Sequence, residues 1–166
     1  MKNNNQDSYG KLTQELIAIS KKSALEIMNI YKSNFEISYK NDKSPVTTAD
    51  RISEDIIINE ISKIEPGVDI ISEEKYFDEE NKASSDIFFL IDPIDGTREF
   101  IKKNDEFTIN IALVVKNKPV IGIINVPALN EIYYSYSNLH SYKITGKNDA
   151  SEIRTRQDKK IETMLH

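Results

Sequence analysis

Apolar residues recur every three or four positions in two stretches near the start of the chain. The first stretch covers residues 12–31 and the second covers residues 49–64, and this spacing predicts two amphipathic helices. Pro66 and Gly67 follow the second stretch and are typical of a helix end. The mostly polar residues 1–11 lie before the apolar pattern, and they are predicted to be disordered.

Runs of β-branched and aromatic residues dominate the rest of the chain and predict strands. The expected strands are residues 68–71, 87–91, 107–115, 119–126, 131–137 and 139–144. The helices precede most of the strands, and strand and helix do not alternate regularly. This order predicts an α+β fold, with two N-terminal helices packed on a largely antiparallel sheet. We expect residues 12–155 to form one domain and residues 156–166 to be a tail.

The composition limits the chemistry. The chain has 166 residues, no cysteine and two histidines. These counts exclude a disulfide scaffold, a thiolate metal site and a cysteine nucleophile, so any metal would have oxygen ligands. The net charge of −5 argues against binding of nucleic acid. No apolar run reaches the ~18 residues of a membrane span, and we expect a cytoplasmic protein. Peripheral attachment to the cytoplasmic face of the inner membrane and homo-oligomerisation are left open.

Acidic residues follow directly after two of the predicted strands. They are Glu73 and Glu74 after the strand at 68–71, and Asp92 and Asp95 after the strand at 87–91. Rigid strand ends can hold carboxylates close together despite their mutual repulsion. Oxygen ligands select a hard cation, and Mg²⁺ is the usual choice when a phosphate completes its coordination. The alternative is a solvated loop, because residues 72–86 contain six acidic side chains.

The six residues from Asp92 to Thr97 add to this candidate site. Pro93 fixes its own φ and Gly96 permits a tight turn, so Ile94 between them can offer its backbone carbonyl to a metal. The N–H groups of Gly96 and Thr97 suit a phosphate oxygen, especially if a helix begins at Thr97, whose side chain can cap it. The alternative is an Asp-Gly turn and a capped helix without a site.

Asp50 lies at the start of the second predicted helix. An isolated aspartate at this position usually caps the helix or interacts with its dipole. The functional alternative is an aspartate that helps a threonine hydroxyl to remove a proton from a metal-bound water. The residue alone leaves both interpretations open.

Four motifs occur in order along the chain, and together they carry a resemblance. They are residues 44–50 (SPVTTAD), 72–74 (SEE), 92–97 (DPIDGT) and 107–113 (FTINIAL). In this order and spacing they resemble the inositol monophosphatase superfamily of Mg²⁺-dependent, lithium-sensitive phosphomonoesterases. Within it, residues 98–104 and 106–108 look most like the CysQ type, the 3′(2′),5′-bisphosphate nucleotidases. The match runs from about residue 12 to about residue 154 and implies the N-terminal half of the inositol-phosphatase-like sugar phosphatase fold.

The resemblance implies roles for individual residues. The implied catalytic residues are Asp50, Glu73 and Thr97. The implied ligands of two or three Mg²⁺ ions are Glu73, Asp92, the Ile94 carbonyl and Asp95, and the implied substrate contacts are Glu73, Ile94, Asp95, Gly96 and Thr97. Lys40 is a more loosely aligned candidate. The implied reaction removes the 3′-phosphate of adenosine 3′,5′-bisphosphate, or of its 5′-phosphosulfate analogue, in sulfur assimilation and nucleotide salvage.

The resemblance also carries a departure. The superfamily continues into a second α/β half with a Trp-Asp motif, whereas this chain contains no tryptophan. We therefore expect residues 12–155 to be the N-terminal metal-binding domain, the C-terminal α/β domain to be absent, and the isolated chain to have weak activity or none. Inositol 1-phosphate is an alternative substrate. A truncated, non-catalytic Mg²⁺-binding module and a generic acidic cation-binding protein are alternatives of another class.

Overall fold

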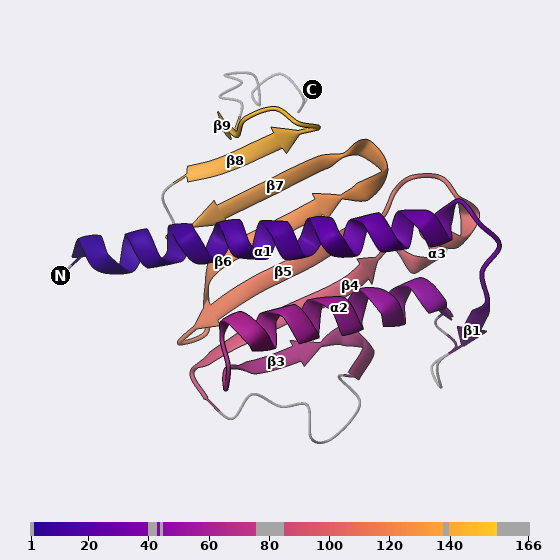
Figure 1. Ribbon diagram of the computed structural model, residues 1–166, viewed down its shortest axis with the longest axis horizontal. Coiled ribbons are helices and arrows are strands. Elements are labelled where there is room, and N and C mark those ends of the chain that lie inside the picture. Colours follow the sequence, from indigo (N-terminus) through magenta and orange to yellow (C-terminus); the bar gives the residue numbers. More distant parts are fainter. Residues whose placement is uncertain (1, 40–42, 44, 76–84, 138–139, 156–166) are drawn as a thin grey trace, which may run out of the picture.

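The computed structural model in Figure 1 describes residues 2–39, 43, 45–75, 85–137 and 140–155. The helices are α1 (Lys2–Tyr31), α2 (Thr48–Ile64) and α3 (Thr97–Lys102), with single 3₁₀ turns η1 (Glu73–Lys75) and η2 (Pro127–Leu129). The strands are β1 (Ile37–Tyr39), β2 (Pro45–Thr47), β3 (Asp69–Ser72), β4 (Ile87–Asp95), β5 (Thr108–Val115), β6 (Lys118–Val126), β7 (Glu131–Tyr136), β8 (His140–Thr145) and β9 (Ser151–Ile153). The predicted α+β class is confirmed.

Seven strands form one sheet in the order β3-β4-β5-β6-β7-β8-β9, and β1 pairs with β2 in a separate antiparallel hairpin. β3 and β4 run parallel, whereas every other neighbouring pair in the sheet is antiparallel. The prediction of a largely antiparallel sheet is thus confirmed. Lys116 and Asn117 connect β5 to β6 and both have positive φ, as in the two-residue turns that match the twist of a hairpin.

Helices α1 and α2 lie side by side on one face of the sheet (Figure 1), where α1 packs mainly on β6 and α2 on β4. Alternate strand residues point into this interface, so Ile91, Ile111 and Ile123 are each about 1% exposed. Residues between them point to the opposite face, where Leu90 is 47% and Ile124 48% exposed. The sheet therefore has one buried face and one open, partly apolar face.

Helix α1 begins at Lys2 and not at residue 12, so the prediction of disorder for residues 1–11 is wrong for the described backbone. The physical reason is packing across the sheet. Tyr9 lies against the hydrophobic core, and Gly10 faces the ring of Tyr136 on β7. None of the helices that the structure describes is long and apolar enough to span a membrane.

Strand β4 continues through Asp92 to Asp95, although the sequence pattern predicts that the strand ends at residue 91. Proline is tolerated there because the register with β5 shifts between Asp92 and Asp95. Such an irregularity leaves a residue outside the hydrogen-bond ladder, and Pro93 has no N–H to contribute to one. The candidate ligands predicted to lie in a loop therefore lie on the irregular end of an interior strand of the sheet.

The two faces of β4 give a stability prediction from adjacent residues. Ile91→Ala removes a fully buried side chain, and we expect it to lower the free energy of unfolding by roughly 2–5 kcal/mol. Leu90→Ala is the matched control on the open face, with an expected loss of less than about 1 kcal/mol. Urea unfolding of both variants measures the difference, and equal losses would show that the open face is buried in solution.

Candidate active site

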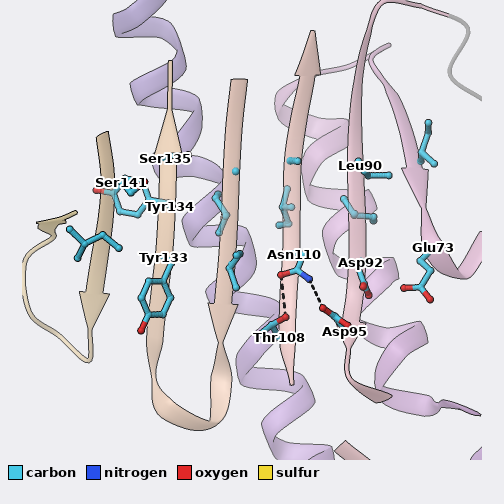
Figure 2. Close-up of a pocket in the computed structure, with 18 residues that line it drawn as sticks. Glu73, Leu90, Asp92, Asp95, Thr108, Asn110, Tyr133, Tyr134, Ser135 and Ser141 are labelled. Carbon is cyan, nitrogen blue, oxygen red and sulfur yellow. Dashed lines mark hydrogen bonds between the residues drawn. The ribbon is translucent and has the colours of Figure 1, made fainter. Parts of the chain in front are cut away.

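The parallel pairing of β3 and β4 brings two carboxylates to one edge of the sheet. Ser72 pairs with Ile91, so the next residues, Glu73 and Asp92, lie beside each other where the two strands end. Figure 2 shows both side chains on the same side of the sheet, with Asp95 close by. The ends of β3 and β4 thus bring acidic side chains together at one place on the sheet.

The first residues of β5 complete this edge. Thr108 donates a hydrogen bond from Oγ1 to Asn110 Oδ1 at 3.1 Å, and Asn110 Nδ2 donates to Asp95 Oδ2 at 3.3 Å (Figure 2). Sequence reasoning gave neither Thr108 nor Asn110 a role. The available signal was their alternation with the buried Ile109 and Ile111, which places two polar residues on the open face beside Asp95.

Gly96 makes the sharp turn from β4 into α3. Its φ is +92°, and a Cβ at this position would lie 2.7 Å from the backbone oxygen of Glu106, so a larger residue is excluded both by strain and by space. The helix begins at Thr97 as expected, but Gly96 is its N-cap residue. The prediction that the Thr97 side chain caps the helix is wrong, because this hydroxyl is bonded elsewhere.

The Thr97 hydroxyl is joined to Asp50 on α2. Thr97 Oγ1 lies 3.1 Å from Asp50 Oδ1 and 3.2 Å from the carbonyl oxygen of Ile94. The other oxygen, Asp50 Oδ2, accepts hydrogen bonds of 2.7 Å from both the backbone N–H and the hydroxyl of Thr47. The capping interpretation of Asp50 is confirmed, since one oxygen closes the capping box of α2, and the other oxygen accepts the hydroxyl of Thr97.

Burial shifts the pKa of two of these carboxyl groups upward. Asp50 is fully buried, and desolvation raises its pKa, although the hydrogen bonds from Thr47 and Thr97 act in the opposite direction. Burial also raises the pKa of Asp92 to about 8, and the neighbouring charge of Glu73 and a hydrogen bond with it add to this effect. Asp95 and Glu74 contribute further repulsion. These effects all disfavour the charged form, so Asp92 is mainly protonated at neutral pH in the protein without metal.

The donor set fits a hard divalent cation. Asp92 Oδ1 is buried and has no hydrogen-bond partner among the described residues, so its lone pairs are available to a cation. The other candidate ligand atoms are carboxylate oxygens and the carbonyl oxygen of Ile94, which keeps a second lone pair beside its hydrogen bond from Thr97. Over the part of the chain that the structure describes, no three acidic or histidine side chains form a complete metal cage.

A cavity of about 870 Å³ opens beside the carboxylates and extends over the open face of the sheet (Figure 2). Glu73, Asp92 and Asp95 form its acidic end together with Thr108 and Asn110, and the remaining lining is mostly apolar. The residues that line the cavity do not include Asp50, Ile94, Gly96 or Thr97. Lys40 and most of the acidic stretch, residues 76–84, lie outside the described residues.

Comparison with known proteins agrees with this geometry. Residues 9–165 match the inositol monophosphatase family. The chain belongs to that family. The predicted resemblance and fold are confirmed, and solved structures of family members superimpose on this chain.

Individual family members give the extent of the likeness. A curated 3′(2′),5′-bisphosphate nucleotidase CysQ from Buchnera aphidicola is 35% identical over 130 residues, which are 77% of this chain and 49% of that protein. The crystal structure of CysQ from Bacteroides thetaiotaomicron is 35% identical with a TM-score of 0.68, covering 82% of this chain and 49% of that one. The extragenic suppressor protein suhB from Bartonella henselae gives a TM-score of 0.72 at 27% identity, covering 80% and 52%. The chain spans about half the length of the curated relatives it matches.

The raised pKa of Asp92 leads to a prediction for the stability of the protein without bound metal. The pKa of Asp92 in the folded chain is about 8 and its ordinary value is 3.8, so folding favours the protonated form and the folded state loses stability as the pH rises between these values. Asp92→Asn removes this penalty. We expect it to raise the free energy of unfolding at pH 8 by roughly 1–3 kcal/mol and to have little effect near pH 4.

Urea unfolding in the presence of a chelator measures this effect, with Asp55→Asn, an exposed carboxylate on α2, as the control. We expect added Mg²⁺ to reverse the order, because an ion held by Asp92 would stabilise the wild-type chain and not Asp92→Asn. A variant that is no more stable than the wild type at pH 8 would contradict the crowding of charge at this strand end.

Proposed function

We propose that this chain forms the metal-binding part of the active site of a Mg²⁺-dependent phosphomonoesterase, which removes the 3′-phosphate from adenosine 3′,5′-bisphosphate to give AMP. The proposal is supported most directly by the hydrogen bond of 3.1 Å between Thr97 and the buried Asp50, which lies next to a group of carboxylates with an unpartnered ligand oxygen. This combination supplies both a proton acceptor and a site for a hard cation.

Asp50 and Thr97 act as the base. Asp50 holds the Thr97 hydroxyl through Oδ1, so the threonine oxygen is free to accept a proton from a water on its other side as its own proton moves to the carboxylate. Burial raises the pKa of Asp50, which makes the carboxylate a better proton acceptor nearer to neutral pH. The two hydrogen bonds from Thr47 keep the carboxylate oriented while it does so.

The remaining residues orient the phosphate and the ions. Glu73, Asp92, Asp95 and the Ile94 carbonyl would hold Mg²⁺, and the N–H groups of Gly96 and Thr97 would contact a phosphate oxygen. When bound, Mg²⁺ supplies Lewis acidity that makes water more acidic and neutralises charge on the phosphate and on the leaving 3′-oxygen. The Asn110 amide positions the Asp95 carboxylate from the neighbouring strand. Such a site hydrolyses the ester directly, without a phosphorylated residue.

Two observations support a nucleotide substrate. The curated relatives at 35% identity are named 3′(2′),5′-bisphosphate nucleotidases, and a solved structure at the same identity is a CysQ protein. A small phosphorylated nucleotide fits this assignment, and sulfur assimilation is the process that we propose for it. Because this chain covers about half of those proteins, the complete pocket and its specificity belong to the proposal.

Phosphate release tests the substrate. We expect the purified chain, or a longer form that contains it, to release phosphate from adenosine 3′,5′-bisphosphate faster than from inositol 1-phosphate, only with Mg²⁺ and less with Li⁺. Asp95→Asn should abolish this release, while Asp55→Asn on the exposed side of α2 should leave it unchanged. Preference for inositol 1-phosphate would overturn the nucleotidase assignment, and tight Ca²⁺ binding without any phosphate release would favour a cation-binding protein.

The threonine hydroxyl gives a sharper test. Thr97→Val keeps the shape of the side chain but removes the hydroxyl that joins Asp50 to the site, and we expect kcat to fall by about 10²–10⁴-fold. Thr97→Ser keeps the hydroxyl and should stay within about tenfold of the wild type. Steady-state kinetics of the two variants separate the effect of the hydroxyl from the effect of the methyl group. Equal losses in both variants would show that the methyl group matters and the hydroxyl does not.

A further inference from the structure

Two buried serines connect both long helices to the strand segment that carries the candidate ligands. Ser53 on α2 donates a hydrogen bond from Oγ to the carbonyl oxygen of Pro93 at 2.8 Å, and the Oγ atoms of Ser23 and Ser53 lie 2.8 Å apart. Both serines are fully buried. A carbonyl only accepts, so the single proton of Ser53 goes to Pro93 and Ser23 must donate to Ser53. The bonds therefore run in one direction, from α1 through α2 to β4.

The carbonyl of Pro93 is part of the peptide plane between Pro93 and Ile94, so a hydrogen bond to this carbonyl orients that plane. The proline ring fixes φ of Pro93, and ψ is its remaining soft torsion. The hydrogen bond from Ser53 fixes this torsion, and with it the plane that the Pro93 carbonyl shares with the nitrogen of Ile94. The ladder with β5 is irregular between Asp92 and Asp95, so the neighbouring strand does not set this plane in the regular way.

Helix α2 contacts the segment at two points. Asp50 and Ser53 are three residues apart and therefore lie on the same face of the helix. Ser53 binds Pro93 and Asp50 binds Thr97, so one rigid helix face holds both ends of the turn that contains Ile94, Asp95 and Gly96. Residues that must resist repulsion between carboxylates need such support.

We infer that Ser53 is a positioning residue, which fixes the segment from Asp92 to Asp95 in the geometry that binds the cation, and that Ser23 assists it by orienting its hydroxyl. This inference rests on the proposed function for the identity of the cation, Mg²⁺. Ser53 itself contacts neither the cation nor the substrate in this scheme. Its effect is exerted through the backbone of Pro93.

Ser53→Ala and Ser20→Ala provide a matched test in the full chain. Ser20 is also fully buried in α1, and its hydroxyl donates to the Ile17 carbonyl at 2.9 Å and accepts from Asn125 at 3.2 Å. Both substitutions remove a buried hydroxyl with two hydrogen bonds, but the bonds of Ser20 lead to its own helix and to β6. A difference between the variants therefore reports on the contact with Pro93.

Two measurements are made on each variant. The first is the Mg²⁺ concentration that gives half of the maximal rise in unfolding temperature, and the second is deuterium exchange of the backbone at residues 92–97. We expect Ser53→Ala to raise the Mg²⁺ midpoint by at least about tenfold and to speed exchange at residues 92–97, while Ser20→Ala changes the midpoint by less than about twofold. Equal changes in both variants overturn the inference.

Ser23→Ala is the second variant, and it keeps the bond between Ser53 and Pro93. We expect it to fold even if Ser53→Ala does not, and to raise the Mg²⁺ midpoint by about threefold. A midpoint equal to that of Ser20→Ala would count against the inference. If the wild-type chain shows no response to Mg²⁺, the proposed function fails, and exchange at residues 92–97 then decides the positioning role alone. Faster exchange in Ser53→Ala than in Ser20→Ala supports it, and equal exchange overturns it.

Discussion

The carboxylate of Asp50 joins the fold to the candidate chemistry, because its two oxygens bind different parts of the molecule. One oxygen accepts two hydrogen bonds from Thr47 and closes the start of α2, while the other accepts the hydroxyl of Thr97 at the start of α3. Asp50 thereby sets the separation between α2 and the start of α3, and the end of β4, which leads into α3, must fit that separation. An aspartate is the shortest residue that offers both oxygens, so helix capping and the proposed proton transfer depend on the same carboxylate.

The carboxylates at the ends of β3 and β4 repel one another, whereas Asp50 is held by hydrogen bonds. Burial raises the pKa of Asp92, and the neighbouring carboxylates of Glu73, Asp95 and Glu74 raise it further. Three features hold these carboxylates in place despite their repulsion. They are the proline and the register shift in β4, the glycine turn before α3, and the hydrogen bond from the amide of Asn110. The candidate site thus lies where carboxylates repel one another and where a proline and a glycine restrict the backbone torsions.

The sequence predicted most of the fold because its helices and strands are amphipathic and regular. It missed the first turns of α1, since the contact that stabilises them, between Gly10 and Tyr136, joins residues far apart in the chain. It placed the end of β4 in a loop, because proline and glycine usually end a strand, whereas here a register shift accommodates Pro93. The three-residue strands β1, β2 and β9 are too short to give a periodic signal.

The candidate site was predictable to the extent that its residues form motifs. The motifs identified Asp50, Glu73, Asp92, Ile94, Asp95, Gly96 and Thr97, and the structure brings the hydroxyl of Thr97 to Asp50 and the carboxylate of Glu73 to Asp92. Thr108, Asn110 and Ser53 were missed as site residues. Polar residues on a strand or a helix carry no local sign of their partners, and only the tertiary arrangement shows which strand end they contact.

The separation along the chain of the bonded residues has a consequence for folding. β5 to β8 form successive hairpins whose partners are close in sequence, so these strands can pair early. The bonds around the candidate site span 30 residues between Ser23 and Ser53, 40 between Ser53 and Pro93, and 47 between Asp50 and Thr97. Closing such long loops costs more entropy before any contact rewards it. We therefore expect the sheet to form first, and the geometry of the candidate site to be assembled only when both helices have docked.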